Sequence, residues 1–177
     1  MRKLTMPELN RLNVNEYHNI TKLPAIIVLD NIRSMENVGA FFRTADAFRI
    51  EAIYLCGITA CPPHREIHKT ALGADESVDW KHFETTVEAC RHLKEMGYKI
   101  FAVEQIENSI KLDKFETPAK SAYIFGNEVA GVDDEVLPYC DQAIEIPQEG
   151  TKHSLNVSVT GGIVMFHLFK DLKKINY

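Results

Sequence analysis

Two short polar turns, each containing glycine, directly follow apolar runs in the last third of this sequence. Gly126-Asn127-Glu128 comes after residues 122–125, and a longer turn over residues 147–156 comes after residues 143–146. An apolar run that ends in Gly, Pro and Asn indicates a strand that continues into a loop. Ligands of open α/β sheets bind at the carboxyl ends of neighbouring strands, where such loops present backbone N–H groups. The two turns therefore predict a cradle for a small molecule.

Strands that alternate with helices must position these turns. Continuous apolar runs of this kind are typical of strands buried on both faces of a parallel sheet. The sequence predicts strands over residues 25–29, 52–55, 98–103, 122–125 and 143–146, and helices over 37–48, 85–96 and about 155–173. This order predicts an α/β domain with a mainly parallel sheet flanked by helices.

The remaining segments lack a strong periodic pattern. Residues 1–23 are polar, contain one short helical candidate over 7–12, and are interpreted as an N-terminal arm that precedes a domain over 24–177. Residues 57–78 are expected to be irregular, and residues 111–120 are expected to form a polar connection. These segments add no domain of their own.

Two helices carry unusual residues. In the helix over 37–48 the apolar residues follow helical spacing, Asn37 is placed to cap the first turn, and Arg43 lies off the apolar stripe. Gly161 and Gly162 fall inside the last helix, where each glycine costs about 1 kcal/mol relative to alanine. Close approach of another backbone or of a ligand would explain the glycine pair, and a kink is the alternative.

Several common sites are missing from the sequence. No G-x-G-x-x-G follows the first predicted strand and no G-x-x-x-x-G-K-[ST] is present, which disfavours an ordinary Rossmann or P-loop enzyme. His64-Arg65-Glu66 matches the H-x-E of zinc deaminases, but no P-C-x-x-C follows. His64 and His68 are four residues apart without forming H-E-x-x-H, so two loop histidines are expected and no metal site is predicted.

Composition indicates a soluble, cytoplasmic protein. No apolar segment follows the basic Met1-Arg2-Lys3, and no apolar run is long enough to span a membrane. The four cysteines form no C-x-x-C pair and are expected to be reduced thiols. A net charge of −5 disfavours a general nucleic-acid coat protein, but it allows a local basic face.

Three blocks of residues together resemble a known family. They are Asn37-Val38-Gly39 with Arg43-Thr44-Ala45, Phe125-Gly126-Asn127-Glu128 with Gly131, and Ile146-Pro147 with Ser154-Leu155-Asn156-Val157-Ser158. In this order they resemble the SpoU/TrmH branch of the SPOUT RNA methyltransferases, over residues 25–172.

The resemblance implies features that periodicity does not indicate. The C-terminal strands and helix would form a deep trefoil knot, although connection rules make such threading very rare. The knot would hold S-adenosylmethionine, and a homodimer would build the active site across its interface. The residues implied in cofactor binding are Val103, Gly126, Asn127, Ile146, Pro147 and Leu155.

The resemblance also implies a catalytic set. Its members are Arg43, Asn37, Glu128, Ser154 and Asn156. Arg43 would face the ribose 2′-hydroxyl, but a guanidinium with a pKa above about 12 is a poor base. Our hypothesis is that Arg43 binds a neighbouring phosphate and stabilises the developing alkoxide, while Asn37 and Glu128 orient it.

Each of these residues has a simpler structural interpretation. Arg43 would be a solvated helix arginine paired with Asp46 or Asp30, and Asn37 and Glu128 would be a helix cap and a solvated turn residue. Ser154 would cap the last helix, and Asn156 would form an Asx turn.

The implied substrate is tRNA or rRNA, with tRNA favoured by the block around Ile146 and Leu155. The RNA-binding residues expected near the site are Arg33, Arg43, Arg65 and Lys152. A non-catalytic RNA-binding or assembly module with the knotted fold is the alternative. A different α/β nucleotide-binding enzyme would need a cofactor loop after Leu29, and Asp30-Asn31-Ile32-Arg33 is not one.

Overall fold

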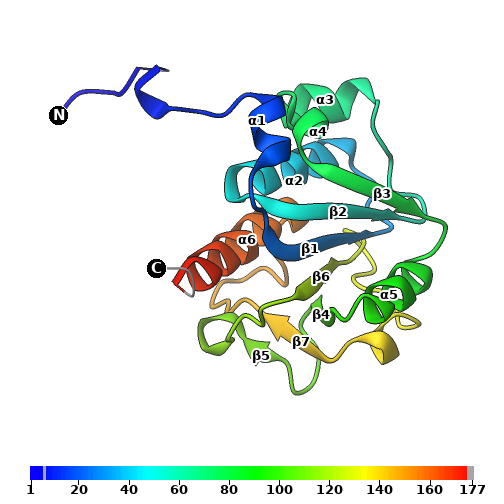
Figure 1. Cartoon of the computed structure of the whole chain (residues 1–177). Coiled ribbons are helices and arrows are strands. Elements are labelled where there is room, and N and C mark those ends of the chain that lie inside the picture. The colour runs from blue at the N-terminus through cyan, green and yellow to red at the C-terminus, as the bar shows by residue number, and fades with distance from the viewer. Residues whose placement is uncertain (6, 175–177) are drawn as a thin grey trace.

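A computed structural model describes residues 1–5 and 7–174, and its centre is one seven-stranded sheet. The strand order is β3-β2-β1-β6-β4-β7-β5, and every pair of neighbouring strands is parallel (Figure 1). The strands are β1 (Leu23–Asp30), β2 (Ile50–Cys56), β3 (Asp79–Phe83), β4 (Lys99–Val103), β5 (Ile110–Lys111), β6 (Ser121–Phe125) and β7 (Gln142–Glu145). The predicted parallel sheet flanked by helices is confirmed.

Helices cover both faces of the sheet. They are α1 (Val14–Asn19), α2 (Met35–Phe48), α3 (Arg65–Ala71), α4 (Ala74–Ser77), α5 (Thr86–Glu95) and α6 (Val157–Lys174), with short 3-10 helices at Pro7–Leu9, Leu112–Lys114 and Leu137–Tyr139. Ile27 and Leu29 of β1 belong to the core with α2, α3 and α6, whereas Ile26 and Val28 belong to the core with α5. Because successive side chains of a strand point to opposite faces, this alternation separates the two cores.

The predicted elements with long apolar runs are confirmed, with ends that differ by at most two residues. The segment over 57–78 is not irregular as expected, because it contains α3 and α4, and β3 follows it without having been predicted. β3 reads Asp-Trp-Lys-His-Phe and is exposed along most of its length. An exposed outermost strand carries no apolar run, so its sequence pattern is absent.

The connection over residues 111–120 was expected to be polar, but part of it is buried. Lys111 ends β5, and Leu112 and Phe115 are buried in the core with α6. At the N-terminus only Pro7–Leu9 of the predicted helix over 7–12 is helical, as a 3-10 turn, and α1 follows it. Asn13 and Glu16 form a capping box at the start of α1, which stabilises this short helix.

The structure also bears on the predictions about membrane spans and cysteines. No helix within the described residues is long and apolar enough to cross a membrane. All four cysteines are free thiols, with Cys56 and Cys90 buried. Burial raises the pKa of Cys90 to about 12, so this thiol stays protonated near neutral pH.

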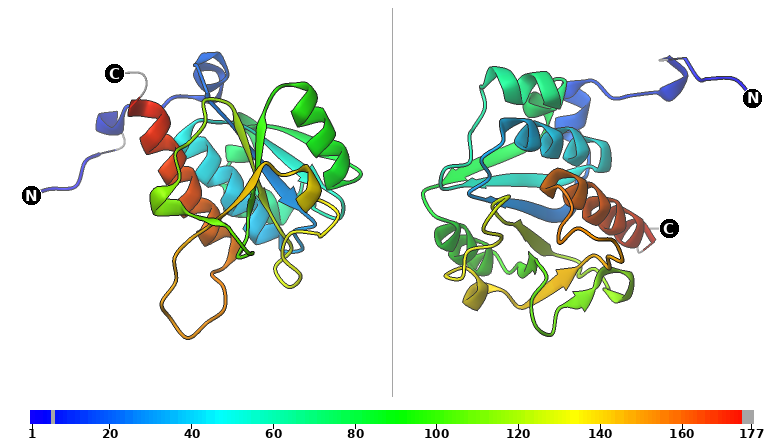
Figure 2. Two further views of the ribbon diagram at one scale, coloured as in Figure 1. Left: turned by 90° about the horizontal axis from the view of Figure 1, so that it is seen from below. Right: turned by 180° about the vertical axis from the view of Figure 1, so that it is seen from behind.

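The glycine pair in α6 marks a close contact with α2, which lies beside it (Figure 2). A Cβ built on Gly161 would overlap the ring of Phe41, whereas a Cβ on Gly162 would meet nothing within 4 Å. Close approach was expected here, but the neighbour is a side chain of α2, and not a backbone or a ligand. Gly161 thus allows α6 to lie directly against Phe41.

We therefore expect Gly161→Ala to lower the free energy of unfolding by about 1–3 kcal/mol, because the added methyl group overpacks the core. Gly162→Ala is the matched control, and it should raise this free energy by up to about 1 kcal/mol through helix propensity. Urea denaturation of the three proteins measures both changes. Equal effects at the two positions would contradict the packing explanation.

Candidate cofactor and catalytic site

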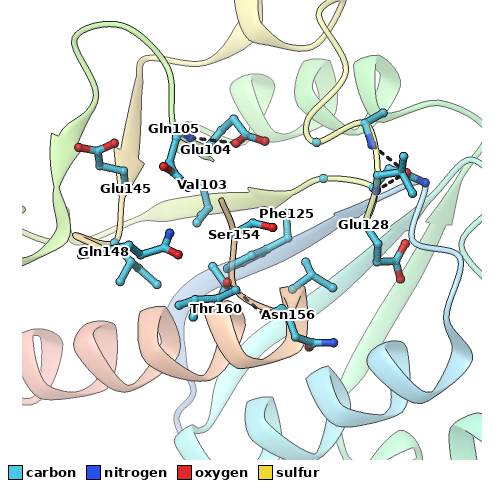
Figure 3. Close-up of a pocket in the computed structure, with 18 of the residues that line it drawn as sticks. Val103, Glu104, Gln105, Phe125, Glu128, Glu145, Gln148, Ser154, Asn156 and Thr160 are labelled. Atoms are coloured by element: carbon cyan, nitrogen blue, oxygen red, sulfur yellow. Dashed lines mark hydrogen bonds between the residues drawn. The ribbon is translucent and has the colours of Figure 1, made fainter. Parts of the chain in front are cut away.

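A cavity of about 510 Å³ opens at the carboxyl ends of β4, β6 and β7, beside the first turn of α6 (Figure 3). Both turns predicted to form a cradle contribute to its wall. The lining residues are Val103, Glu104, Gln105, Phe125, Gly126, Asn127, Glu128, Val129, Ala130, Gly131, Ile144, Glu145, Ile146, Gln148, Ser154, Leu155, Asn156, Val157 and Thr160. The parallel sheet brings these segments together because all its strands end at the same edge.

The turn after β6 is a tight loop that only glycine permits at two positions. A Cβ on Gly126 would overlap the backbone of Gly131 and Val132, and Gly131 has a left-handed φ of +76°. Asn127 closes this loop, because its Oδ1 accepts hydrogen bonds from Val129 N (2.9 Å) and Ala130 N (3.1 Å). The side chain of Asn127 also donates to the carbonyl of Asn31 at 2.7 Å.

Glu104, directly after β4, fixes the far side of the same loop. Its carboxylate accepts hydrogen bonds from Gln105 N at 2.9 Å and from Val132 N at 3.2 Å. The same carboxylate lies where a Cβ on Gly131 would be. Sequence reasoning did not select Glu104, Gln105, Glu145, Gln148 or Thr160, although the first four stand at the ends of two predicted strands.

Glu128 connects the loop to the N-terminus of α2. Its carboxylate accepts hydrogen bonds from Arg33 N, Ser34 N and the side-chain amide of Asn37, each at 3.0 Å. Burial alone would raise the pKa of Glu128, but these hydrogen bonds together hold the pKa below its ordinary value. Glu128 is exposed, as the simpler interpretation expects of a turn residue, but these three hydrogen bonds fix its carboxylate.

Asn37 does not cap α2 as expected. Ser34 is the cap, and its Oγ accepts from Asn37 N at 3.2 Å, so the helix begins two residues earlier than predicted. The side chain of Asn37 instead joins Glu128 to Asn156, whose Nδ2 donates to Asn37 Oδ1 at 3.2 Å. These three polar residues of the predicted catalytic set thus form one network.

Asn156 also begins α6. Its Oδ1 accepts hydrogen bonds from Ser158 N at 2.9 Å and from Val159 N at 3.3 Å, the arrangement of a helix N-cap. The interpretation of Ser154 as the cap is therefore wrong, and Ser154 lines the cavity. The cap and the network share one side chain, so the start of α6 is fixed relative to α2.

Arg43 lies away from this network. It is exposed on α2 and lines a second depression of about 600 Å³ together with Arg11, Asp46 and Arg49. Six residues separate Arg43 from Asn37, which places the two side chains about 120° apart around the helix and about 9 Å apart along it. Asn37 and Glu128 of the same chain are hydrogen-bonded to each other, so the expectation that they orient Arg43 within the chain is wrong.

The simpler interpretation of Arg43 is supported only in part, because the residue is exposed on α2 but does not pair with Asp46 or Asp30. Asp46 accepts a hydrogen bond from Ser77 Oγ at 2.6 Å, and the buried Asp30 accepts from Thr86 Oγ1 at 2.5 Å and Asp133 N at 3.0 Å. Within residues 1–5 and 7–174, Arg43 forms no ion pair with either carboxylate. Its guanidinium faces solvent.

The other predicted residues are distributed more widely. Pro147 is absent from the cavity lining, although its neighbours Ile146 and Gln148 are part of it. Arg33 contributes its backbone N–H to Glu128, Lys152 is exposed in the loop before α6, and Arg65 begins α3 at a separate depression.

No metal site emerges from the geometry of the described part of the chain. No group of three His, Cys, Asp or Glu side chains there is arranged to hold a metal ion. His64 instead caps α3, where its Nδ1 accepts from Glu66 N at 3.2 Å.

The cavity has a pronounced charge bias. Glu104, Glu128 and Glu145 line it, and no Lys or Arg is among the described lining residues. Carboxylates at a partly enclosed site favour a ligand that carries positive charge. The backbone groups of the two loops provide neutral donors and acceptors beside them.

Comparisons with known proteins give a consistent assignment. The model of the SpoU rRNA Methylase family matches residues 24–166, which is most of the chain. The 23S rRNA (guanosine-2'-O-)-methyltransferase RlmB of Neisseria meningitidis serogroup B is 32% identical over 147 residues, covering 83% of this chain and 58% of that protein. The tRNA (guanosine(18)-2'-O)-methyltransferase of Thermus thermophilus is 30% identical over 159 residues, covering 90% and 81%. The chain therefore spans less than two thirds of the length of the first of these relatives.

Solved structures show the same fold. The TrmH/SpoU tRNA modifying enzyme of A. aeolicus superposes with a TM-score of 0.82 at 23% identity, covering 92% of this chain and 82% of that chain. The AdoMet-bound rRNA methyltransferase from Sinorhizobium meliloti superposes with a TM-score of 0.79 at 25% identity, covering 88% and 60%.

We expect Glu128→Gln to lower the free energy of unfolding at neutral pH by about 1 kcal/mol, because the amide leaves one of three donors without its acceptor. A carboxyl whose pKa is lowered on folding stabilises the protein above its unfolded-state pKa, and this contribution is lost as the pH falls through the folded-state pKa. The difference between wild type and Glu128→Gln should therefore shrink as the pH falls below about 4.

Urea denaturation at a series of pH values measures this difference. Glu135→Gln, an exposed glutamate on the same loop, is the control and should show no comparable change. A difference that stays constant with pH would mean that the Glu128 charge does not hold the loop.

Proposed function

We propose, on the premise that this chain belongs to the SpoU rRNA methylase family, that it methylates a ribose 2′-hydroxyl of a structured RNA with S-adenosylmethionine as the donor. The observation that carries the proposal is the anionic cavity built from the ends of β4, β6 and β7. tRNA is favoured over rRNA by the block that contains Ile146, Pro147 and Leu155. The cytoplasm is the expected location.

The cavity fits this cofactor by charge and by the groups that line it. S-adenosylmethionine supplies an activated methyl group on a positively charged sulfonium, and Glu104 and Glu145 would stabilise that charge and its ammonium group. The backbone groups of Gly126, Ile146 and Leu155 would bind the remaining polar atoms. Pro147 would act only by shaping the loop. The chain's own task is to align the cofactor with the ribose oxygen.

The relatives support this reaction class. Two of them are named guanosine 2′-O-methyltransferases, one for rRNA and one for tRNA. The rRNA methyltransferase from Sinorhizobium meliloti is described with AdoMet bound. These names support methylation of RNA and agree on no single RNA.

The knotted topology expected from the family is part of the proposal. Segment 104–120 contacts the C-terminal segment at both ends: Gln105 Nε2 donates to His153 O at 2.9 Å, and Thr117 Oγ1 donates to Asp171 at 3.1 Å. His167 also lies within 3.0 Å of Phe115 O. Segment 104–120 thus contacts the chain both before α6 and along α6. These contacts support a knot in which the C-terminal segment passes through the loop formed by residues 104–120.

A homodimer would bring Arg43 to the cavity. Arg43 lies on a different face of α2 from the Asn37–Glu128 network, so it would serve the cavity of the partner subunit. Val159, Ile163 and Phe166 leave an exposed apolar stripe on α6, next to α2, and this stripe supports a subunit contact. There Arg43 would bind the phosphate beside the target ribose and stabilise the developing alkoxide, while that phosphate or a water molecule would take the proton of the 2′-hydroxyl.

The alternative is a non-catalytic RNA-binding or assembly module with the same fold. The separation of Arg43 from the cavity within one chain favours this alternative if no dimer forms. A binding module would retain affinity for the cofactor or the RNA but would transfer no methyl group.

We expect wild-type protein to transfer labelled methyl groups from S-adenosylmethionine to unmodified tRNA or rRNA, and nucleoside mapping to find 2′-O-methylation. Arg43→Ala should reduce the rate by about 10²–10³-fold, the typical loss when a group that stabilises an oxyanion is removed. Calorimetry should show unchanged cofactor binding. Lys94→Ala, on α5 at the opposite face of the sheet, is the control. Cofactor binding without transfer to either RNA pool would favour the binding module, and no cofactor binding would overturn the proposal.

Subunit mixing tests whether Arg43 acts across a dimer. Thr160→Trp should block the cavity, so that this variant and Arg43→Ala are each inactive. In co-expressed mixed dimers one site combines an open cavity with Arg43 of the partner subunit, and random pairing should restore about a quarter of the wild-type activity. Inactive mixed dimers would show that Arg43 does not act across subunits.

A further inference from the structure

A third depression, of about 510 Å³, lies between α3 and β3. β3 is the outermost strand on the side of the sheet opposite to β7 and β5 (Figure 1). Its wall consists of Pro62, Pro63, His64, Arg65, His68, Trp80 and two acidic residues, Asp75 and Glu76. The methyl-transfer proposal uses none of these residues.

Trp80 is the single tryptophan of the chain, and 39% of it is exposed. Its strand partner Ile53 is fully buried in the core with α2 and α3, so Trp80 faces the same side of the sheet. The helices cover Ile53 but not Trp80, which leaves part of the indole open to the depression.

A paired histidine lines the same depression as this ring. His68 Nδ1 lies 3.1 Å from both carboxylate oxygens of Asp75, whose side chain is only 6% exposed, whereas that of His68 is 55% exposed. This contact fixes the imidazole ring, and Asp75 raises the pKa of His68 above its ordinary value. The depression is thus bordered by a flat ring that readily carries positive charge.

Two exposed cationic side chains lie on α3, and one of them, Arg65, lines the depression. The side chain of Arg65 is 93% exposed and lies 3.9 Å from Glu66, the outer limit of an ion pair. Lys69, one turn further along α3, is also exposed. Both side chains are free to meet a phosphate, because exposed ion pairs of this kind contribute little energy.

These features match the recognition of a nucleobase. Proteins bind unstacked RNA bases by stacking them on aromatic and histidine rings, while arginine and lysine contact the flanking phosphates. We propose that the depression between α3 and β3 binds one unstacked nucleobase of the RNA substrate, at a position outside the methylated nucleotide. The inference rests on the proposed function, because that function supplies the RNA.

The depression between α3 and β3 is close enough to the cavity for one RNA molecule to contact both. Three strand spacings separate β3 from β6, which corresponds to about 15 Å across the sheet. A folded RNA that presents its ribose at the cavity is large enough to place a loop base at Trp80. Trp80 would then contribute to the choice of RNA and not to the chemical step.

The single tryptophan makes the test direct, because its fluorescence reports on this depression alone. Titration of the full-length protein with unmodified tRNA and rRNA pools should quench the Trp80 fluorescence in a saturable way. Trp80→Ala should weaken RNA binding in a filter assay by roughly 5- to 150-fold, the usual effect of removing a stacking ring. Trp80→Phe should bind RNA almost as tightly as wild type. Cofactor affinity should be unchanged in both variants.

Met96→Ala is the matched control, because Met96 is an exposed apolar residue of similar accessibility, 40%, at the end of α5. It should leave RNA affinity unchanged. Guanosine and adenosine monophosphates form a further arm of the titration. Quenching by a mononucleotide at the same affinity as RNA would assign the depression to a free nucleotide and overturn the RNA contact.

The outcomes separate this inference from the proposed function. Methyl transfer by wild type without quenching, and with unchanged RNA affinity of Trp80→Ala, would overturn the inference and leave the methyltransferase intact. Saturable quenching and weakened binding of Trp80→Ala would support the site even if no methyl transfer occurred. A Trp80→Ala protein that also lost cofactor affinity would indicate a general structural defect and would count against a separate base site.

Discussion

The carboxylate of Glu128 organises the site because it joins segments that are far apart in the sequence. It stands just after β6 and accepts two backbone hydrogen bonds from Arg33 and Ser34 and one from the amide of Asn37. Asn37 in turn accepts a hydrogen bond from Asn156, which caps the start of α6. The end of β6 and the starts of α2 and α6 are therefore held by one network, and two of its members, Glu128 and Asn156, line the cavity.

Neighbouring strands repeat this arrangement. Asp30 ends β1 and accepts from Asp133 N, and Glu104 follows β4 and accepts from Val132 N. β1, β6 and β4 are adjacent in the sheet, so three carboxylates in a row satisfy backbone donors of the loop after β6 and of the segment directly before α2. Val132 and Val136 of this loop are buried in the core with α5, and these hydrogen bonds hold its polar part in place.

The sequence indicated the parts of the fold that have continuous apolar runs. β1 and β6 are buried along their length and were predicted for that reason, as was the cradle formed by the loops around Gly126 and Ile146. β3 is exposed at the edge, so its sequence has no comparable pattern. The position of Arg43 depends on the rotation of α2, and the role of Asn37 depends on a partner 91 residues away. Neither follows from local sequence.

The distribution of charge gives the acidic balance of the chain a physical meaning. Under the proposed function, the carboxylates of the cavity would face a cationic cofactor, and a nearby RNA phosphate would be repelled by the same groups, because charges within about 8 Å are only partly screened. The exposed arginines, including Arg11, Arg43 and Arg49, lie outside the cavity. Under the proposed function, Arg43 of the partner subunit would compensate this repulsion at the point where the ribose meets the cofactor. The proposed reaction must bring together a cationic methyl donor and an anionic RNA backbone. An acidic cofactor site and a separate cationic residue would meet this need, because each binds one of the two charges.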